Sequence, residues 1–159
     1  MFPPELGQRL RAKLGLPTSR SEDRALVEGI LQLLARERVD HTIFWRRLSH
    51  YAGNAEAAPV RDLFLDRTAL DDWLKQYDAR LAQEDSTRAA ATMLGTNPKF
   101  ILRNHLGELA IRQAREKDFS GVARLLALLE NPYAEHPGHE AEAGLPPDWA
   151  TSIEISCSS

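Results

Sequence analysis

The chain has 159 residues, a formal net charge of -3 and a single cysteine, Cys157. This length predicts one ordinary domain with its own hydrophobic core, and a lone cysteine excludes an internal disulfide framework. The acidic balance argues against nucleic acids and anionic membranes as partners, and we find neither a signal peptide after Met1 nor an apolar run that could span a membrane, so we expect a cytoplasmic protein.

The first half of the chain predicts three helices. Apolar residues recur at helical spacing over 21–39, with Ser21 as the expected cap. Asp40 can cap a second helix, which ends near Gly53. After a linker, Asp66 or Thr68 can open a third helix, whose apolar residues form a one-sided stripe.

The second half predicts three more helices. A run of small residues favours a helix over 87–94, ended by Gly95. Asn97 can cap the next helix, because Pro98 suits a first turn, where its missing N–H group would be unpaired anyway. A last helix runs up to Asn131, which precedes a proline.

The expected fold is therefore all-α. We find no fixed repeat period, so a compact irregular helical bundle is expected over residues 1–131. Prolines and glycines become frequent beyond that point, which predicts an extended C-terminal arm over residues 132–159.

Residue patterns that carry common chemistry are mostly missing. Glycines are scattered singly, whereas phosphate-binding loops need several close together. Asp71 and Asp72 point about 100° apart on a helix, so they cannot share a proton or a metal ion. His136 and His139 could bind Zn²⁺, but a Pro/Gly-rich loop lacks the rigid support of such sites, which favours a solvated loop. We expect no catalytic residue, no metal site and no bound cofactor in this chain.

Two cations, Lys99 and Arg103, follow the helix start predicted at Asn97. Exposed N–H groups at a helix start, together with nearby cations, can hold a phosphate or a carboxylate. Ordinary capping and a salt bridge explain the same residues, and we favour that interpretation.

Cys157 lies among hydroxyl residues near the C-terminus. No histidine neighbours it in the sequence, and the nearby carboxylates lower its thiolate fraction. It is therefore a poor hydrolytic nucleophile, although it remains competent for thiol–disulfide exchange. A reactive thiol and an ordinary tail cysteine are both compatible with this position.

Several stretches, taken together and in order, resemble a known family. They are Lys13-Leu14-Gly15-Leu16, residues 40–48, residues 97–105, Asp118-Phe119-Ser120, Asn131-Pro132-Tyr133, Pro146-Pro147-Asp148-Trp149 and residues 155–159. These stretches resemble the C-terminal region of the selenoprotein O family, the pseudokinase-fold protein adenylyltransferases. Members of that family transfer AMP from ATP, with Mg²⁺, onto hydroxyl groups of other proteins.

The resemblance implies a division of labour. The nucleotide-binding and metal-binding residues of the family belong to an N-terminal kinase-like core, so we expect this chain to be inactive alone, with ATP and Mg²⁺ used by the full-length family. In some members selenocysteine stands at the position of Cys157, which implies a redox-regulatory thiol there.

We expect this chain to be a helical accessory domain of such an adenylyltransferase. Its implied partner is the kinase-like core of the same protein or of a neighbouring chain, with Asn97, Lys99 and Arg103 as candidate contacts. An apolar face normally covered by that core predicts self-association of the isolated chain. The alternative is a stand-alone helical protein-interaction module without enzymatic activity.

Overall fold

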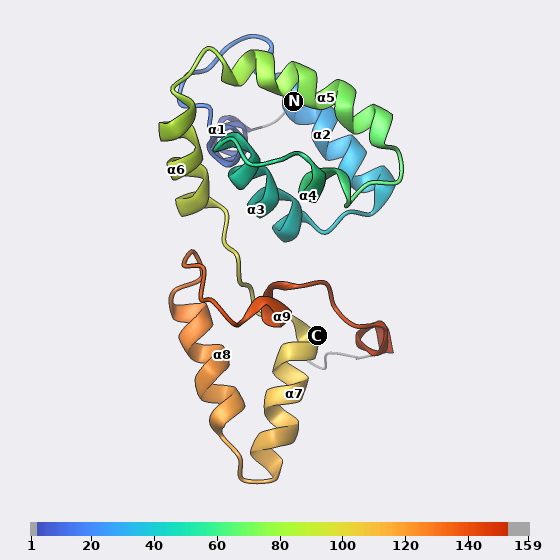
Figure 1. Ribbon diagram of the computed structural model, residues 1–159, viewed down its shortest axis with the longest axis vertical. Coiled ribbons are helices and arrows are strands. Elements are labelled where there is room, and N and C mark those ends of the chain that lie inside the picture. Colours follow the sequence, from blue (N-terminus) through green and yellow to red (C-terminus); the bar gives the residue numbers. More distant parts are fainter. Residues whose placement is uncertain (1–2, 153–159) are drawn as a thin grey trace. The chain divides into compact units, whose positions relative to one another are not determined.

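The computed structural model describes residues 3–152 (Figure 1), and all regular structure in that range is helical. The all-α prediction is confirmed. The chain divides into two compact units, Met1–Asn97 and Pro98–Ser159. This boundary differs from the one expected after residue 131, because the N–H groups of Lys99 and Phe100 both donate to the carbonyl of Pro132, at 2.9 and 3.3 Å. The segment after residue 131 is thereby tied to the start of the second unit.

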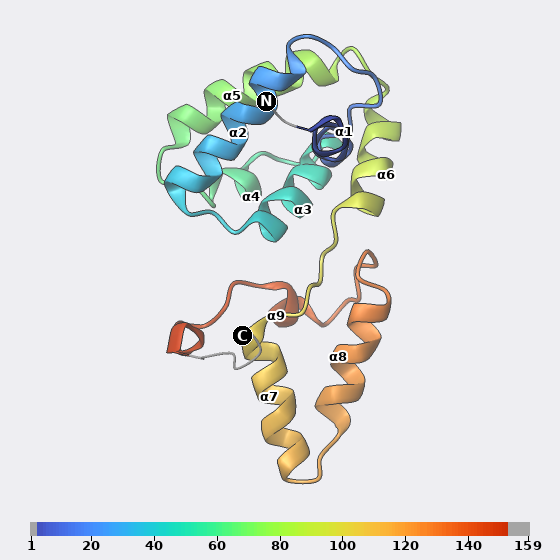
Figure 2. The ribbon, with the colours of Figure 1, turned by 180° about the vertical axis from the view of Figure 1, so that it is seen from behind.

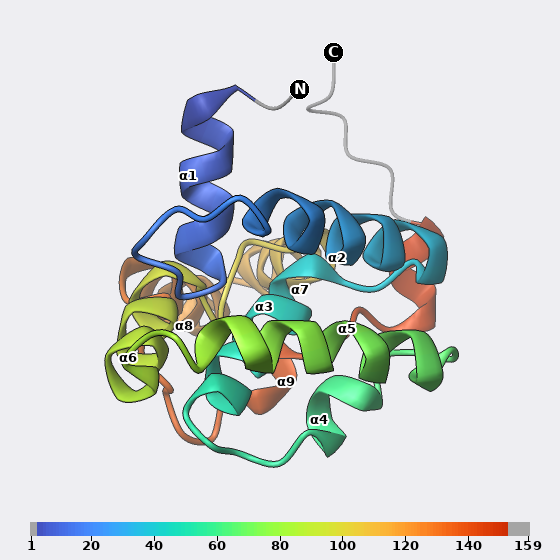
Figure 3. The ribbon, with the colours of Figure 1, turned by 90° about the horizontal axis from the view of Figure 1, so that it is seen from above.

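The first unit consists of helices packed around one core. They are α1 (Pro4–Lys13), α2 (Asp23–Glu37), α3 (His41–Ala52), α4 (Ala58–Arg61), α5 (Arg67–Leu81) and α6 (Ser86–Thr96). Helices α2 and α5 run side by side (Figure 3), α3 packs against α6, and α1 contacts both α2 and α6.

Aspartates begin three of these helices. Asp40, Asp66 and Asp85 each accept a hydrogen bond from the backbone N–H group three residues later, at 2.9, 3.0 and 3.2 Å. Such a bond satisfies one of the donors that a helix start leaves free. The caps predicted at Asp40 and Asp66 are confirmed, whereas Ser21 does not cap α2, whose N-cap is Glu22.

Two helices of the first unit were not predicted. Helix α1 begins at Pro4, directly after Pro3, and the short α4 lies in the segment that we expected to be a linker. In both helices a proline occupies the first turn. A proline there costs no hydrogen bond, so the two prolines mark a helix start and do not prevent one.

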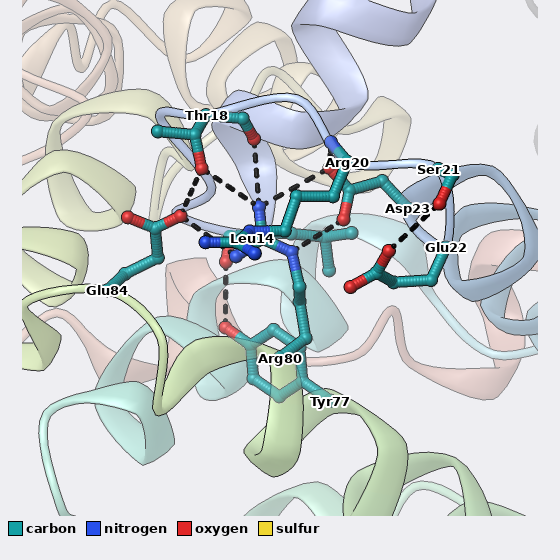
Figure 4. A network of polar contacts seen from close by, with 9 residues as sticks. All are labelled: Leu14, Thr18, Arg20, Ser21, Glu22, Asp23, Tyr77, Arg80 and Glu84. Carbon is teal, nitrogen blue, oxygen red and sulfur yellow. Dashed lines mark hydrogen bonds and ion pairs between the residues drawn. The ribbon is translucent and has the colours of Figure 1, made fainter.

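Aromatic side chains from α3 and α5 fill the centre of the first unit. Phe44 is fully buried and meets Trp45 and Trp73 edge to face. Trp73 stacks on Tyr77, with ring centroids 5.1 Å apart and planes only 9° from parallel. The Tyr77 hydroxyl donates to the carbonyl of Leu14, at 2.9 Å (Figure 4). The apolar stripe predicted on this third helix is therefore a core face.

A buried ion-pair network joins α5 to the chain around α2 (Figure 4). Arg80 donates to Asp23 at 2.6 Å, to Glu84 at 2.8 Å and to the Thr18 carbonyl at 2.8 Å. The hydrogen bond to Asp23 is the main cause that raises the pKa of Arg80. These contacts are internal to the first unit, and they give Arg80 a structural role.

The second unit is built on a hairpin of two antiparallel helices (Figure 2), α7 (Asn104–Arg115) and α8 (Ser120–Glu130). After α8 the chain continues through the short α9 (Glu140–Ala143) and a 3₁₀ helix, Asp148–Ser152. The described part of the expected arm, residues 132–152, thus contains two short helical elements. No described helix is both long and apolar enough to cross a lipid bilayer.

The helix start predicted at Asn97 is wrong. Helix α6 includes Gly95 and ends at Thr96, and the next helix begins only at Asn104. Asn97 is fully buried, and its side-chain amide donates to the Lys13 carbonyl and to the Ser49 hydroxyl, both at 3.0 Å. These tertiary bonds within the first unit outweigh the local capping preference.

Candidate functional site

The α7–α8 hairpin and the segment 141–149 form a cavity of about 550 Å³, here called the hairpin cavity. Its volume lies within the range of small-molecule pockets. Most of the lining is apolar, and it includes Leu106, Leu109, Leu125, Leu145, Pro147 and Trp149. Four polar residues also reach it, namely His105, Gln113, Arg124 and Glu142.

Close packing at Gly121 and a hydrogen-bonded turn before α8 position the two helices. Gly121 is buried on α8, and a methyl group added there would collide with the side chain of Gln113 on α7. Before α8, Asp118 accepts hydrogen bonds from the hydroxyl and the N–H group of Ser120, at 2.6 and 3.0 Å. These two bonds hold the pKa of Asp118 below its usual value. The small residue and the hydrogen-bonded turn together set the hairpin that forms the cavity.

His105 is the most deeply buried polar side chain of the hairpin cavity, with only 4% of its surface exposed. Its ring meets that of Trp149 edge to face, with centroids 6.2 Å apart. Within the described residues it makes no hydrogen bond. Burial, together with the charge of Arg103, lowers the pKa of His105, so the ring is neutral at pH 7.

The charges around the cavity are paired. Arg124 lies 3.4 Å from Glu142, at the cavity wall. Arg112 is 3.0 Å from Glu108 and lies over the ring of Trp149, 5.4 Å from its centroid. Because each cation has a carboxylate beside it, the cavity carries no strong net charge.

A second apolar surface lies on α8 and its N-cap. Phe119, Val122 and Leu126 follow one another at helical spacing, and their exposed fractions are 63%, 43% and 55%. We call these three residues the α8 stripe. The helix also buries Gly121 and Leu128, so it is apolar on more than one side. Neighbouring exposed apolar side chains of this size make the stripe a candidate contact surface.

Comparison with known proteins identifies the family. A family model described as "Protein adenylyltransferase SelO" matches residues 1–130. The chain belongs to this family. A protein nucleotidyltransferase YdiU from Variovorax paradoxus is 59% identical over the whole chain, and one from Albidiferax ferrireducens is 56% identical, also over the whole chain. The chain covers 32% and 33% of these two relatives, so it spans about a third of their length.

The candidate contact residues singled out from the sequence belong to different units. Asn97 is part of the core of the first unit, and Lys99 and Arg103 belong to the second. Lys99 lies 3.0 Å from both Glu135 and Glu140, and although burial opposes it, hydrogen bonds to these carboxylates raise the pKa of Lys99. The role of these three residues as anion or core contacts stays a prediction, as does that of Cys157, which lies outside the described residues.

The loop histidines take structural positions. His136 meets Phe100 edge to face, and its Nε2 is 2.8 Å from the carbonyl oxygen of Asn131. His139 is 3.6 Å from Glu142. Across residues 3–152, no group of three or more metal-ligating side chains is placed to hold an ion.

Sequence reasoning missed the hairpin cavity. The sequence did indicate that His105 is buried, because His105 shares the apolar side of an amphipathic helix with Leu102, Leu106 and Leu109. A histidine at such a position is expected to be buried. The sequence does not predict which other residues line the cavity, since the segment 141–149 has no regular pattern.

Proposed function

We propose that this chain is a helical accessory part of a SelO-family protein adenylyltransferase, and that it packs against a kinase-like core located in the cytoplasm. In this proposal the core binds ATP and Mg²⁺ and transfers AMP to protein hydroxyl groups. The family match and the share of the relatives that the chain spans both support it.

The residues that line the hairpin cavity do not fit ATP with Mg²⁺. Its wall is mostly apolar, and Arg124 in the lining and Arg112 over Trp149 are already paired with carboxylates. A triphosphate needs free cations or a row of backbone N–H groups, and its metal ion needs carboxylates in one place. We therefore derive no catalytic step from this chain and assign it a structural contribution.

The α8 stripe is the observation that carries the proposal. Phe119 and Leu126 are each more than half exposed, although side chains of this size are normally buried. An accessory domain that packs on a larger protein presents such a surface when that protein is removed. We assign the stripe as the contact with the kinase-like core.

The proposal for Cys157 rests on the family resemblance. In this proposal Cys157 and a cysteine of the core form a disulfide, and their two electrons and two protons pass to a disulfide oxidant, which is reduced to two thiols. A Cys157→Ser variant tests this, because it should abolish any oxidant-dependent cross-link between the chain and the core on non-reducing electrophoresis. A cross-link that persists in the variant would contradict the assignment.

Co-expression with the remaining two thirds of the Variovorax paradoxus relative tests the accessory role. We expect the two polypeptides to co-purify, and Leu126→Lys to reduce the yield of complex at least tenfold. Leu65→Lys is the matched control, because Leu65 is 96% exposed in the first unit and lies outside the stripe. Failure of the wild-type chain to co-purify would favour the stand-alone interaction module.

An AMP-transfer assay tests the division of labour. The chain alone, incubated with labelled ATP, Mg²⁺ and candidate protein substrates, should transfer no label. Label transfer by the chain alone would overturn the accessory role. Transfer by the co-purified complex provides the positive control.

A further inference from the structure

The hairpin cavity combines an apolar wall with one largely buried polar side chain, His105, which makes no hydrogen bond to another described residue. The nitrogens of His105 are not among the described side-chain atoms that are sealed from solvent without a partner, so water in the cavity can reach them. A ligand that enters the cavity can replace this water as the hydrogen-bond partner of His105.

The chemistry of the lining restricts what that partner is. A neutral imidazole offers one donor and one acceptor, and a hydroxyl group can both donate and accept. A carboxylate would lose its hydration without gaining a cation, because Arg124 is already paired with Glu142. Leu109, Leu125 and Trp149 provide apolar area for the rest of the molecule.

We propose that the hairpin cavity binds a neutral, mostly apolar small molecule that carries a hydroxyl group, and that His105 hydrogen-bonds this hydroxyl. The site is separate from the α8 stripe and does not depend on the accessory role. Trp149 contributes an aromatic wall next to His105, so an aromatic alcohol fits both residues at once.

A pair of matched probes tests the proposal on the chain as it exists. 4-Propylphenol carries the hydroxyl group, and propylbenzene has the same apolar body without it. We expect saturable one-to-one binding of 4-propylphenol by calorimetry, three- to tenfold tighter than that of propylbenzene, as one net hydrogen bond predicts. NMR shift changes should be confined to α7, α8 and residues 141–149.

Two variants separate the hydrogen bond from the cavity itself. His105→Phe keeps a ring against Trp149 and removes both nitrogens, so it should weaken binding of 4-propylphenol to the level of propylbenzene and leave propylbenzene unchanged. Leu109→Trp narrows the cavity and should weaken both probes. Leu126→Trp is its control, because Leu126 lies on the same hairpin but does not line the cavity. Circular dichroism checks that each variant keeps its helices.

Three results would overturn the proposal. One is the absence of saturable binding for both probes, and another is an equal affinity of wild type and His105→Phe for 4-propylphenol. The third is a set of shift changes centred on the α8 stripe, which would assign the binding to a surface for polypeptide contacts.

Discussion

Arg80 Nε lies 2.6 Å from Asp23 Oδ1, and both side chains are almost completely buried. The two residues are 57 positions apart in the sequence, on α5 and at the start of α2. Asp23 also accepts a hydrogen bond from the backbone N–H group of Arg20, at 2.9 Å. A single carboxylate therefore fixes both the loop before α2 and the helix that packs beside it.

Asp23→Ala should destabilise the first unit strongly. The substitution leaves the Arg80 guanidinium buried without its main counter-charge, and breaking a buried pair in this way costs about 3–5 kcal/mol. Asp62→Ala is the control, since it removes an ion pair with Arg67 in which both side chains are more than half exposed, worth less than about 1 kcal/mol. Urea unfolding followed by tryptophan fluorescence measures both. Equal small losses would contradict a structural role for Arg80.

The parts of the fold that could be predicted depend on local interactions. The caps at Asp40 and Asp66 each involve a backbone group three residues away, so a short window of sequence contains both partners. Asn97 shows the opposite case. Its neighbours Gly95 and Pro98 favour a helix boundary, but hydrogen bonds to residues far away in the sequence decide its conformation.

The candidate site was less predictable for the same reason. The amphipathic pattern of α7 places His105 on a buried face, yet the far wall of the cavity is an irregular segment without periodicity. The high share of apolar residues on α8 was visible in the sequence, but which of them remain exposed as the α8 stripe depends on how the helix packs. Neither pattern predicts what the hairpin cavity or the α8 stripe binds.

Two glycines predict opposite effects of the same substitution. Gly15 has a φ of +72°, and a methyl group there would lie 2.9 Å from the sulfur of Met93 and 3.1 Å from Cβ of Ala89. Gly15→Ala should therefore reduce the unfolding free energy by more than about 1 kcal/mol. Gly95 lies inside α6, and a methyl group added there would meet no atom of another part of the chain within 4 Å. Gly95→Ala should therefore increase the unfolding free energy by about 0.5–1 kcal/mol.

Thermal unfolding of the two glycine variants side by side checks this prediction. Each melting temperature is compared with that of the wild-type chain, and the two shifts should have opposite signs. A stabilised Gly15→Ala chain would show that the residues around Gly15 move aside, and it would contradict the conformation of this turn.

His105 predicts a loss of stability in mild acid. Burial and the charge of Arg103 lower its pKa in the folded state, while in the unfolded chain it titrates near the ordinary value of about 6.5. As the pH falls below that value, the unfolded chain binds a proton that the folded chain does not, so the unfolding free energy decreases. Asp118 affects the unfolding free energy only at more acidic pH, because the pKa of its carboxyl is lowered and the unfolded chain begins to bind this proton only near pH 4.

Urea unfolding between pH 7.5 and 5, followed by the NMR signals of α7 and α8, measures this effect. His105→Phe should flatten the pH dependence, since it removes the titrating ring. His41→Asn is the control, because His41 is exposed on α3 in the other unit, and it should leave the dependence unchanged. A wild-type chain whose second unit is equally stable at pH 7.5 and 5 would exclude this role of His105.

The α8 stripe predicts self-association of the isolated chain. Phe119, Val122 and Leu126 follow one another at helical spacing, and because their exposure to water is unfavourable, a second copy of the chain can cover them. Sedimentation at increasing protein concentration should therefore show a reversible dimer. Leu126→Lys should shift the chain to the monomer, because pairing two stripes would bury two lysines without partners. Leu65→Lys, in the first unit, should dimerise like the wild type, and a wild-type chain that stays monomeric at millimolar concentration would mean that the stripe alone does not drive association.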